Sequence, residues 1–213
     1  MEKDKKYILK VILFAVLVVI LIFAIMMIKN FIILRKLTDL SKDFKESKNF
    51  IAKRYDMQGK NLSIAKTYSK DGKTLTYLNT IIEDSEKQRK VTAYKDETNN
   101  MMIIAEDEKK ILLTGEHVII PALSVRDVTE YYNDNVCSIM ILAVAKIKTE
   151  RCNDTDCYMV ELADDMKIWY SKETGLIVRE IDGSYVYDYC YEFDTVQESD
   201  IQKPDTTGCI IPE

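Results

Sequence analysis

The feature that most constrains this chain is an apolar run of 18 residues, Val11 to Ile28, that carries no charge. As an α-helix the run is about 27 Å long, close to the thickness of the hydrocarbon core of a bilayer. A small domain could not surround such a cylinder with protein. A cleaved signal peptide has a shorter apolar core of about 7 to 15 residues and a small-x-small cleavage site, whereas this run ends in two methionines and an isoleucine before Lys29. Residues 1–34 are therefore predicted to be a short tail and a retained transmembrane signal-anchor.

The orientation of the anchor is predicted from its flanks and from the length of the chain that follows. Four lysines precede the run, while Lys29, Arg35 and Lys36 follow it. This charge bias is weak, but long domains cross membranes regardless of nearby charge, and a basic tail before a long apolar run is typical of a signal-anchor. We expect a single-pass protein of the cell membrane, with the N-terminus in the cytoplasm and the domain outside.

Residues 35–213 have the length of one domain. Their net charge indicates which kinds of partner that domain can bind. The formal net charge of the chain is −5; residues 1–34 carry five Lys against Glu2 and Asp4, a net charge of +3, which leaves −8 for the rest. An acidic domain disfavours nucleic acid as a partner. The single histidine, His117, excludes most catalytic triads and multi-histidine zinc sites. We expect a non-catalytic protein without catalytic residues, metal ligands or a cofactor.

Apolar residues continue at helical spacing after the membrane segment, with charged residues between them. This pattern predicts one amphipathic helix. Neither Gly nor Pro lies between Ile28 and Tyr55, so the helix is expected to run on from the membrane span. The recurring apolar residues are Leu37, Leu40, Phe44, Ile51 and Tyr55.

From Asn61 onward the apolar period changes to two, which indicates β-strands. Asp71-Gly72 and Asp182-Gly183 are hairpin signals between such segments. Consecutive antiparallel strands are the simplest arrangement, so residues 35–213 are predicted to form a single α+β domain with a large antiparallel sheet of about eleven strands. The expected strands lie at residues 62–68, 74–84, 88–96, 101–106, 110–114, 117–120, up to 150, 157–162, 167–171, 176–181 and 185–193.

The stretch from Ser124 to Ala145 interrupts the strands. Its polar start predicts a helix, and its later residues are apolar. Because it breaks the meander, we expect it to lie over the sheet as a lid on any apolar cavity. Apolar stripes here and on the strands more often form a packed core than line a cavity, and the sequence does not decide between the two. The cavity candidates are Met101, Ile103, Ile139 and Ile141.

Four of the five cysteines are disulfide candidates: Cys152, Cys157, Cys190 and Cys209. Cys152 and Cys157 bracket residues 153–156, and a four-residue hairpin loop would bring the two within disulfide range. A second pair between Cys190 and Cys209 would leave Cys137 as the odd thiol, although the connectivity stays open. The loop at residues 153–156 lacks the central Gly and the bidentate Glu of a calcium loop, so it is predicted to be a solvated tip.

Two stretches near the C-terminus resemble a known family. Residues 167–179, KIWYSKETGLIVR, are similar to a hairpin of the LolA-like lipoprotein carrier superfamily, and Asp200-Ile201 with residues 204–208 resembles the end of its Gram-positive extracytoplasmic members. The resemblance extends over about residues 37–213. It implies a curved, incomplete β-barrel wrapped around helices, with an apolar cavity that accepts lipid or acyl chains.

Two functional hypotheses follow. The first is a membrane-anchored extracytoplasmic module, of the LolA-like type, that binds a lipid, an acyl chain or a lipoprotein in its half-barrel. The second is a structural or regulatory subunit of a cell-envelope or sporulation assembly, in which the same fold has a filled core and contacts an envelope protein. The presence or absence of a bound lipid discriminates between them.

Overall fold

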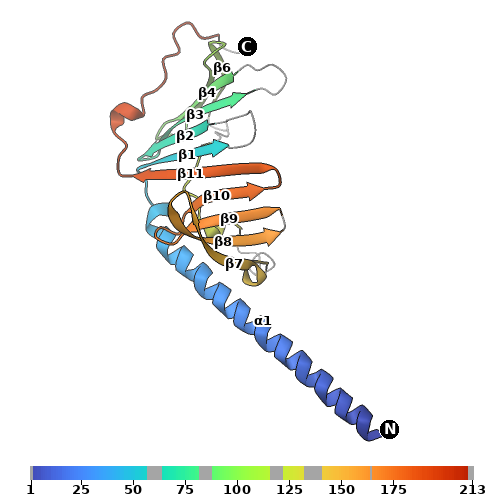
Figure 1. Ribbon diagram of the computed structural model, residues 1–213. Helices are drawn as coiled ribbons and strands as arrows, with labels where there is room; N and C mark the ends of the chain where they lie inside the picture. Colours follow the sequence, from blue (N-terminus) through green and yellow to red (C-terminus); the bar gives the residue numbers. More distant parts are fainter. Residues whose placement is uncertain are drawn as a thin grey trace.

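The computed structural model describes residues 2–56, 64–81, 88–115, 122–131, 141–163 and 165–210. It consists of one long helix, α1 (Glu2–Lys45), followed by an eleven-stranded antiparallel sheet with short helical segments. In Figure 1 the sheet is curved and open, and α1 projects from one end of it. The predicted fold class, an N-terminal apolar helix followed by a curved antiparallel sheet, is confirmed.

Helix α1 is continuous through the apolar run and beyond it, as expected. Its 44 residues contain neither Gly nor Pro, and at 1.5 Å per residue they extend over about 66 Å. It is long and apolar enough to cross a membrane, and its most apolar window has no buried residue. Lys42 and Lys45 occupy its last turn, where positive charge interacts favourably with the negative end of the helix dipole.

The prediction that this helix reaches Tyr55 is wrong. The helix ends at Lys45, and Ile51 and Tyr55 lie on the first strand, β1 (Phe50–Asp56). Ser47 gives the backbone an alternative to the helix, because its hydroxyl donates to the carbonyl of Asn49 and accepts from the amide of the same residue. The Asn49 side chain then binds the backbone of Val196 at both its amide and its carbonyl. These contacts turn the chain from helix into strand.

The eleven strands form one sheet in the order β6-β5-β4-β3-β2-β1-β11-β10-β9-β8-β7. Strands β1 to β6 pair consecutively, and so do strands β7 to β11. Strand β1 pairs with β11 and joins these two halves of the sheet. The expected strand at 117–120 lies outside the described residues, and β1, which was expected to be helix, is a strand of the sheet. The other strands are β2 (Ile64–Lys70), β3 (Lys73–Ile81), β4 (Gln88–Lys95), β5 (Met101–Ala105), β6 (Lys110–Gly115), β7 (Lys146–Cys152), β8 (Thr155–Ala163), β9 (Met166–Ser171), β10 (Ile177–Asp182) and β11 (Tyr185–Phe193).

Two-residue turns set the register of the hairpins. Asp71 and Gly72 both have positive φ, as a type I′ turn requires, and they join β2 to β3 as predicted. Asn153 and Asp154 also have positive φ and join β7 to β8. The four-residue loop expected at 153–156 is therefore wrong, because Asn and Asp tolerate the left-handed region and allow the strands to continue two residues further.

The two faces of the sheet are covered by different segments. On the helix face, Leu34 and Leu37 of α1 form a buried cluster with Val160, Ile168 and Tyr170. On the opposite face, which we call the tail face, the C-terminal segment lies across β1 to β4. Its contacts are the buried cluster of Ile51, Leu75, Tyr94, Val196 and Ile201. Buried hydrophobic clusters thus lie on both faces of the same sheet.

The predicted helix near Ser124 is present only as a 3-10 turn, Val128–Tyr131. A further helical turn lies at residues 141–144, directly before β7. Residues 132–140, which include Cys137 and Ile139, lie outside the described residues. The described segment 122–131 nevertheless takes part in a buried polar region, which includes Asp127 and Glu180.

Candidate functional site

The best-defined polar region is the place where the end of α1 meets the sheet, which we call the junction. The turn between β9 and β10 touches α1 here at Gly175, whose φ is +72°. A Cβ at Gly175 would lie 3.0 Å from the backbone nitrogen of Ser41, 3.2 Å from the carbonyl carbon of Leu37, and closer still to its oxygen. Only glycine allows the backbones to approach this closely. The backbone of α1 is therefore in direct contact with the backbone of the β9–β10 turn.

Asp127 is the buried acid of the junction, with 1% of its surface exposed. One carboxylate oxygen accepts from the Ser41 hydroxyl at 2.7 Å, and the other accepts from Lys45 Nζ at 3.1 Å. The amide and hydroxyl of Thr129 donate to the second oxygen as well. Burial alone would raise the pKa of Asp127, but the bonds from Thr129, Ser41 and Lys45 outweigh it and lower the pKa below its ordinary value. Asp127 thus links α1 to the segment that follows β6 while remaining ionised.

Arg126 forms a second buried network, directed toward the sheet. Its guanidinium donates to Glu180 at 2.6 Å, to Glu130 at 2.6 Å and to the hydroxyl of Tyr131 at 3.0 Å. It also donates to the hydroxyl of Tyr189, and both tyrosine hydroxyls donate to Glu180. Burial raises the pKa of Glu180, but the bonds from Tyr131 and Arg126 outweigh it, and the net pKa lies below the ordinary value. The charges of Arg126 and Glu180 are thus paired, and the Glu180 carboxylate accepts hydrogen bonds from Arg126, Tyr131 and Tyr189.

The number of donors bound to each buried carboxylate limits the chemistry that the junction can perform. A general base needs a free lone pair directed at a substrate, and a nucleophile needs a neighbouring base. The carboxylates of Asp127 and Glu180 are instead held by several protein donors each. Within the described ranges, no group of three or more His, Cys, Asp or Glu is arranged to hold a metal ion. The junction is therefore best described as a clamp between helix, segment and sheet.

The segment 122–131 connects three parts of the fold. The amide of Leu123 donates to the Thr67 hydroxyl on β2 at 2.8 Å. Three residues later, Arg126 accepts a backbone bond from Ile177 at the start of β10, and Asp127 reaches α1. This short segment thus spans from the β1–β6 half of the sheet to the β7–β11 half and to the helix.

A cleft lies where β10 and β11 separate. The two strands pair only from Arg179–Asp188 to Asp182–Tyr185, while β11 continues to Phe193. The resulting opening, which we call the splay cleft, has a volume of about 560 Å³. Its lining includes Phe44 of α1, Leu176 and the exposed Cys190. Its size falls within the range of small-molecule sites.

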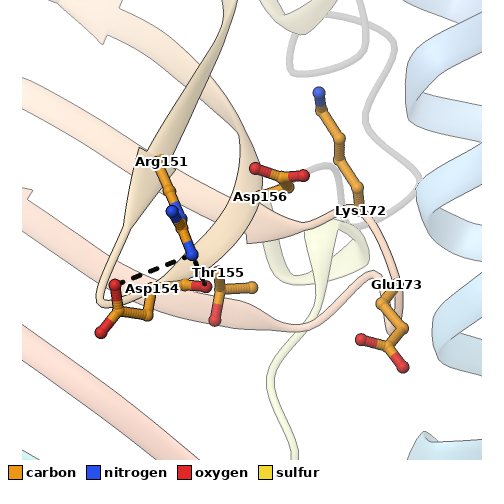
Figure 2. Close-up of a pocket in the computed structure, with 6 residues that line it drawn as sticks. All are labelled: Arg151, Asp154, Thr155, Asp156, Lys172 and Glu173. Atoms are coloured by element: carbon orange, nitrogen blue, oxygen red, sulfur yellow. Dashed lines mark hydrogen bonds and ion pairs between the residues drawn. The ribbon is translucent and has the colours of Figure 1, made fainter.

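A second cleft is larger and polar, with a volume of about 670 Å³. Figure 2 shows its six lining residues at the β7–β8 turn and the β9–β10 turn: Arg151, Asp154, Thr155, Asp156, Lys172 and Glu173. Arg151 and Asp154 form an ion pair at 3.8 Å, and the Asp154 side chain is almost fully exposed. The predicted solvated tip at residues 153–156 is consistent with this open, mixed-charge surface.

Two shallow clefts adjoin each other on the tail face of the other half of the sheet. Their volumes are about 370 and 290 Å³, and they share Tyr77, Thr92 and Glu106. Tyr77 is 43% exposed and stands edge-on to Tyr68. An exposed aromatic ring between two clefts is the kind of feature found at protein interfaces.

Met101 and Ile103 lie on the same strand, but none of the clefts above joins them to Ile141. Ile103 is buried on the helix face of β5, Met101 is half-buried on the same strand, and Ile141 is 52% exposed in the turn before β7. None of the four clefts above is lined by these three residues. Ile139 lies outside the described residues, so a shared cavity of all four stays a prediction.

The four described cysteines, Cys152, Cys157, Cys190 and Cys209, are free thiols. Cys152 and Cys157 share a buried cluster with Trp169, but Cys152 pairs with Thr155 across the hairpin, so the cysteines are diagonal neighbours. Burial raises the pKa of Cys157 to about 11, which keeps it protonated and slow in thiol exchange. The predicted disulfide between Cys152 and Cys157 is absent from the structure, and so is the Cys190–Cys209 pair, which the sequence left open.

Cys190 and Cys209 lie in different parts of the sheet. Cys190 is on β11 opposite Lys53, whereas Cys209 packs against Met102 and Ile111 of β5 and β6. Four strands, β1 to β4, lie between β11 and β5. This separation is the physical reason against the second pair.

Comparisons with known proteins give the chain no family. No family model matches it, and no curated protein matches it. Among solved structures, an uncharacterized conserved protein from Thermus thermophilus is 7% identical, with a TM-score of 0.48, over 84% of this chain and 98% of that one. PNGF-II is 12% identical with a TM-score of 0.31, and the match covers 76% of this chain and 30% of that one. These likenesses are too distant to carry a functional argument, and the LolA-like relationship stays a prediction.

Proposed function

We propose that this protein is a membrane-anchored, non-catalytic interaction module whose half-barrel is filled by its own anchor helix. One observation carries the proposal: α1 continues without a break from its apolar run into the helix face of the sheet. Leu34, Leu37 and Ser41 are buried there, where a carrier of the LolA-like type would hold its lipid. A filled half-barrel favours the second sequence hypothesis, an envelope or sporulation subunit.

The partner of such a module is expected at the half of the sheet that α1 leaves uncovered. Tyr77 and its two clefts lie on that half, away from the anchor. A photoreactive amino acid placed at Tyr77 should give one discrete protein adduct in living cells. The matched control is Tyr185, which is also exposed but lies at the β10–β11 turn. Equal adduct patterns at the two positions would contradict a specific partner surface.

The lipid-binding hypothesis retains one observation in its favour, the splay cleft beside Phe44 and Leu176. Titration of the full chain in detergent with a fluorescent acyl-chain probe tests it. Cys190 is exposed and lines this cleft, so Cys190→Trp should fill it, whereas Ser184→Trp at the exposed β10–β11 turn should not. The proposal expects no saturable binding. Saturable binding that only Cys190→Trp abolishes would establish a lipid-binding module instead.

The proposal also places the domain outside the cytoplasm. Ser184 is exposed in the β10–β11 turn, so a Ser184→Cys variant in a Cys190→Ser background offers a thiol that a membrane-impermeant maleimide can reach. Labelling above the Cys190→Ser parent is expected in intact cells. Labelling that appears only after lysis would reverse the orientation.

A further inference from the structure

We propose that the edge strand β7 and the turn before it rest on the surface of the bilayer that α1 crosses, so that the domain contacts the membrane at a second place. We call residues 141–152 the membrane edge. The inference rests on the proposed anchor, and it adds a lipid contact that a helix alone does not require. The intended occupant is the headgroup layer of the same membrane.

The first argument is the level at which the domain meets the helix. Asn30 lies two residues after the apolar run and is 2% exposed. Its side-chain amide donates to the carbonyl oxygens of Ala143 and Ala145 at 2.8 and 2.7 Å. Two residues of helix correspond to about 3 Å. The membrane edge is therefore held at the height where the hydrocarbon core ends.

The second argument is exposed apolar surface at this height. Ile141 and Val144 are 52% and 41% exposed. In the part of the domain that the structure describes, the other exposed large hydrophobic residues are Tyr77, Tyr185 and Ile210, which do not form one group. On α1, Phe31 and Ile32 are exposed beside Asn30. An apolar patch that continues from a transmembrane helix is suited to the interfacial layer of lipid.

The third argument is charge. Strand β7 carries Lys146, Lys148 and Arg151 against Glu150, and all four are exposed. Lys146 pairs with Glu161 at 3.3 Å and Arg151 with Asp154 at 3.8 Å, but such surface ion pairs are weak and can exchange for lipid phosphate. The rest of the domain is acidic, with a net charge of −8 over residues 35–213. A basic strip on an acidic domain is drawn to anionic lipid headgroups while the other surfaces are repelled. The charge thus favours lipid over a second copy of the same strip.

The sheet topology agrees with this placement. Strand β7 is an edge strand, and Figure 1 shows it as the strand closest to the free part of α1. Its outer backbone groups need water or polar partners, so it belongs in the headgroup layer and not in the hydrocarbon. Only Ile141 and Val144 need to reach deeper. The remaining strands then follow one another away from the membrane, and ten spacings of about 4.8 Å place β6 about 48 Å away along the sheet.

Depth-dependent quenching tests the inference with the full chain in vesicles of phosphatidylcholine and phosphatidylglycerol. One thiol at a time is introduced by Val144→Cys or Lys148→Cys, in a Cys137→Ser, Cys190→Ser and Cys209→Ser background that leaves only the buried Cys152 and Cys157, and is labelled with a fluorophore. Acyl-chain-brominated lipid should quench the label at Val144 several-fold more than a label introduced by Glu108→Cys in the β5–β6 turn. The Lys148 label should lie between these two, so that the result does not depend on one variant.

A label introduced by Val18→Cys in the middle of α1 separates the two proposals. If Val18 is quenched while Val144 and Lys148 match Glu108, the anchor stands and the membrane edge is refuted. If Val18 is not quenched, the anchor itself fails. If Val144 and Lys148 are shielded from aqueous iodide but not quenched by brominated lipid, a protein covers the edge and the inference is also refuted.

Discussion

Replacement of Gly175 by Ala tests the fit of α1 against the sheet. Two costs apply to this variant. An L-residue at φ +72° costs about 1 to 2 kcal/mol, and the new Cβ would lie 3.0 Å from the backbone nitrogen of Ser41, an overpacking that adds about 1 to 3 kcal/mol. The free energy of unfolding should therefore fall by about 2 to 5 kcal/mol.

Gly183→Ala is the matched control, because Gly183 has a φ of +58° but, beyond its chain neighbours, no atom of a described residue lies within 4 Å of its added Cβ. It should cost only about 1 to 2 kcal/mol. The difference of about 1 to 3 kcal/mol corresponds to about 2 to 12 °C in melting temperature for a chain of this size. Thermal unfolding of the full chain in detergent can be followed by the fluorescence of Trp169, the single tryptophan. Equal melting temperatures for the two variants would refute the close contact between helix and turn.

Further predictions concern the buried polar groups. Asp127 has a folded-state pKa below its ordinary value of 3.8, so its stabilising contribution is complete above about pH 4 and is lost as the pH falls through the folded pKa. Asp127→Asn should lower the free energy of unfolding by about 1.5 to 3 kcal/mol at pH 7. The variant should also lose less stability than the unchanged protein when denaturation is repeated at falling pH, and an equal loss would contradict this. Tyr170 is fully buried, and its hydroxyl has no hydrogen-bond partner among the described residues, so Tyr170→Phe should be neutral or stabilising in urea denaturation. Tyr189→Phe should cost about 0.5 to 1.5 kcal/mol, because that hydroxyl bonds to Glu180; the reverse order of the two variants would show that the network is misassigned.

Local signals made the hairpins and the long apolar helix predictable from sequence. An unbroken apolar run specifies a helix of membrane length whatever surrounds it. Asp71-Gly72 specifies a turn because both residues tolerate positive φ. Such features depend on a few adjacent residues, so the sequence alone determines them.

Strand β1 was missed because its spacing fits two periods. Ile51 and Tyr55 are four residues apart, which matches one turn of helix and also one face of a strand. The decision is made by tertiary partners: Ile51 pairs with Tyr68 on β2 and with Glu192 on β11. A partner 141 positions away leaves no trace in the local pattern.

The junction could not be predicted for a similar reason. Arg126 and Glu180 are 54 residues apart in the chain, and in sequence each resembles an ordinary solvated charge. Asn30 carried a local signal, since it is an uncharged polar residue between the apolar run and the apolar residues 31–34, and a buried amide there needs a partner. That partner, the backbone of Ala143 and Ala145, becomes visible only in the fold.

The junction also favours a fixed position over a shuttling role. A carrier that moves between membranes needs a flexible linker or no anchor, but α1 has neither Gly nor Pro. It is held by the turn before β7 at Asn30 and by the segment 122–131 at Lys45. The segment 122–131 then ties this half of the sheet to β2 through Leu123 and Thr67. Among the described residues, both halves of the sheet are thus linked to α1 by packed elements. Such a construction suits a spacer that holds a partner surface at a set height above the membrane.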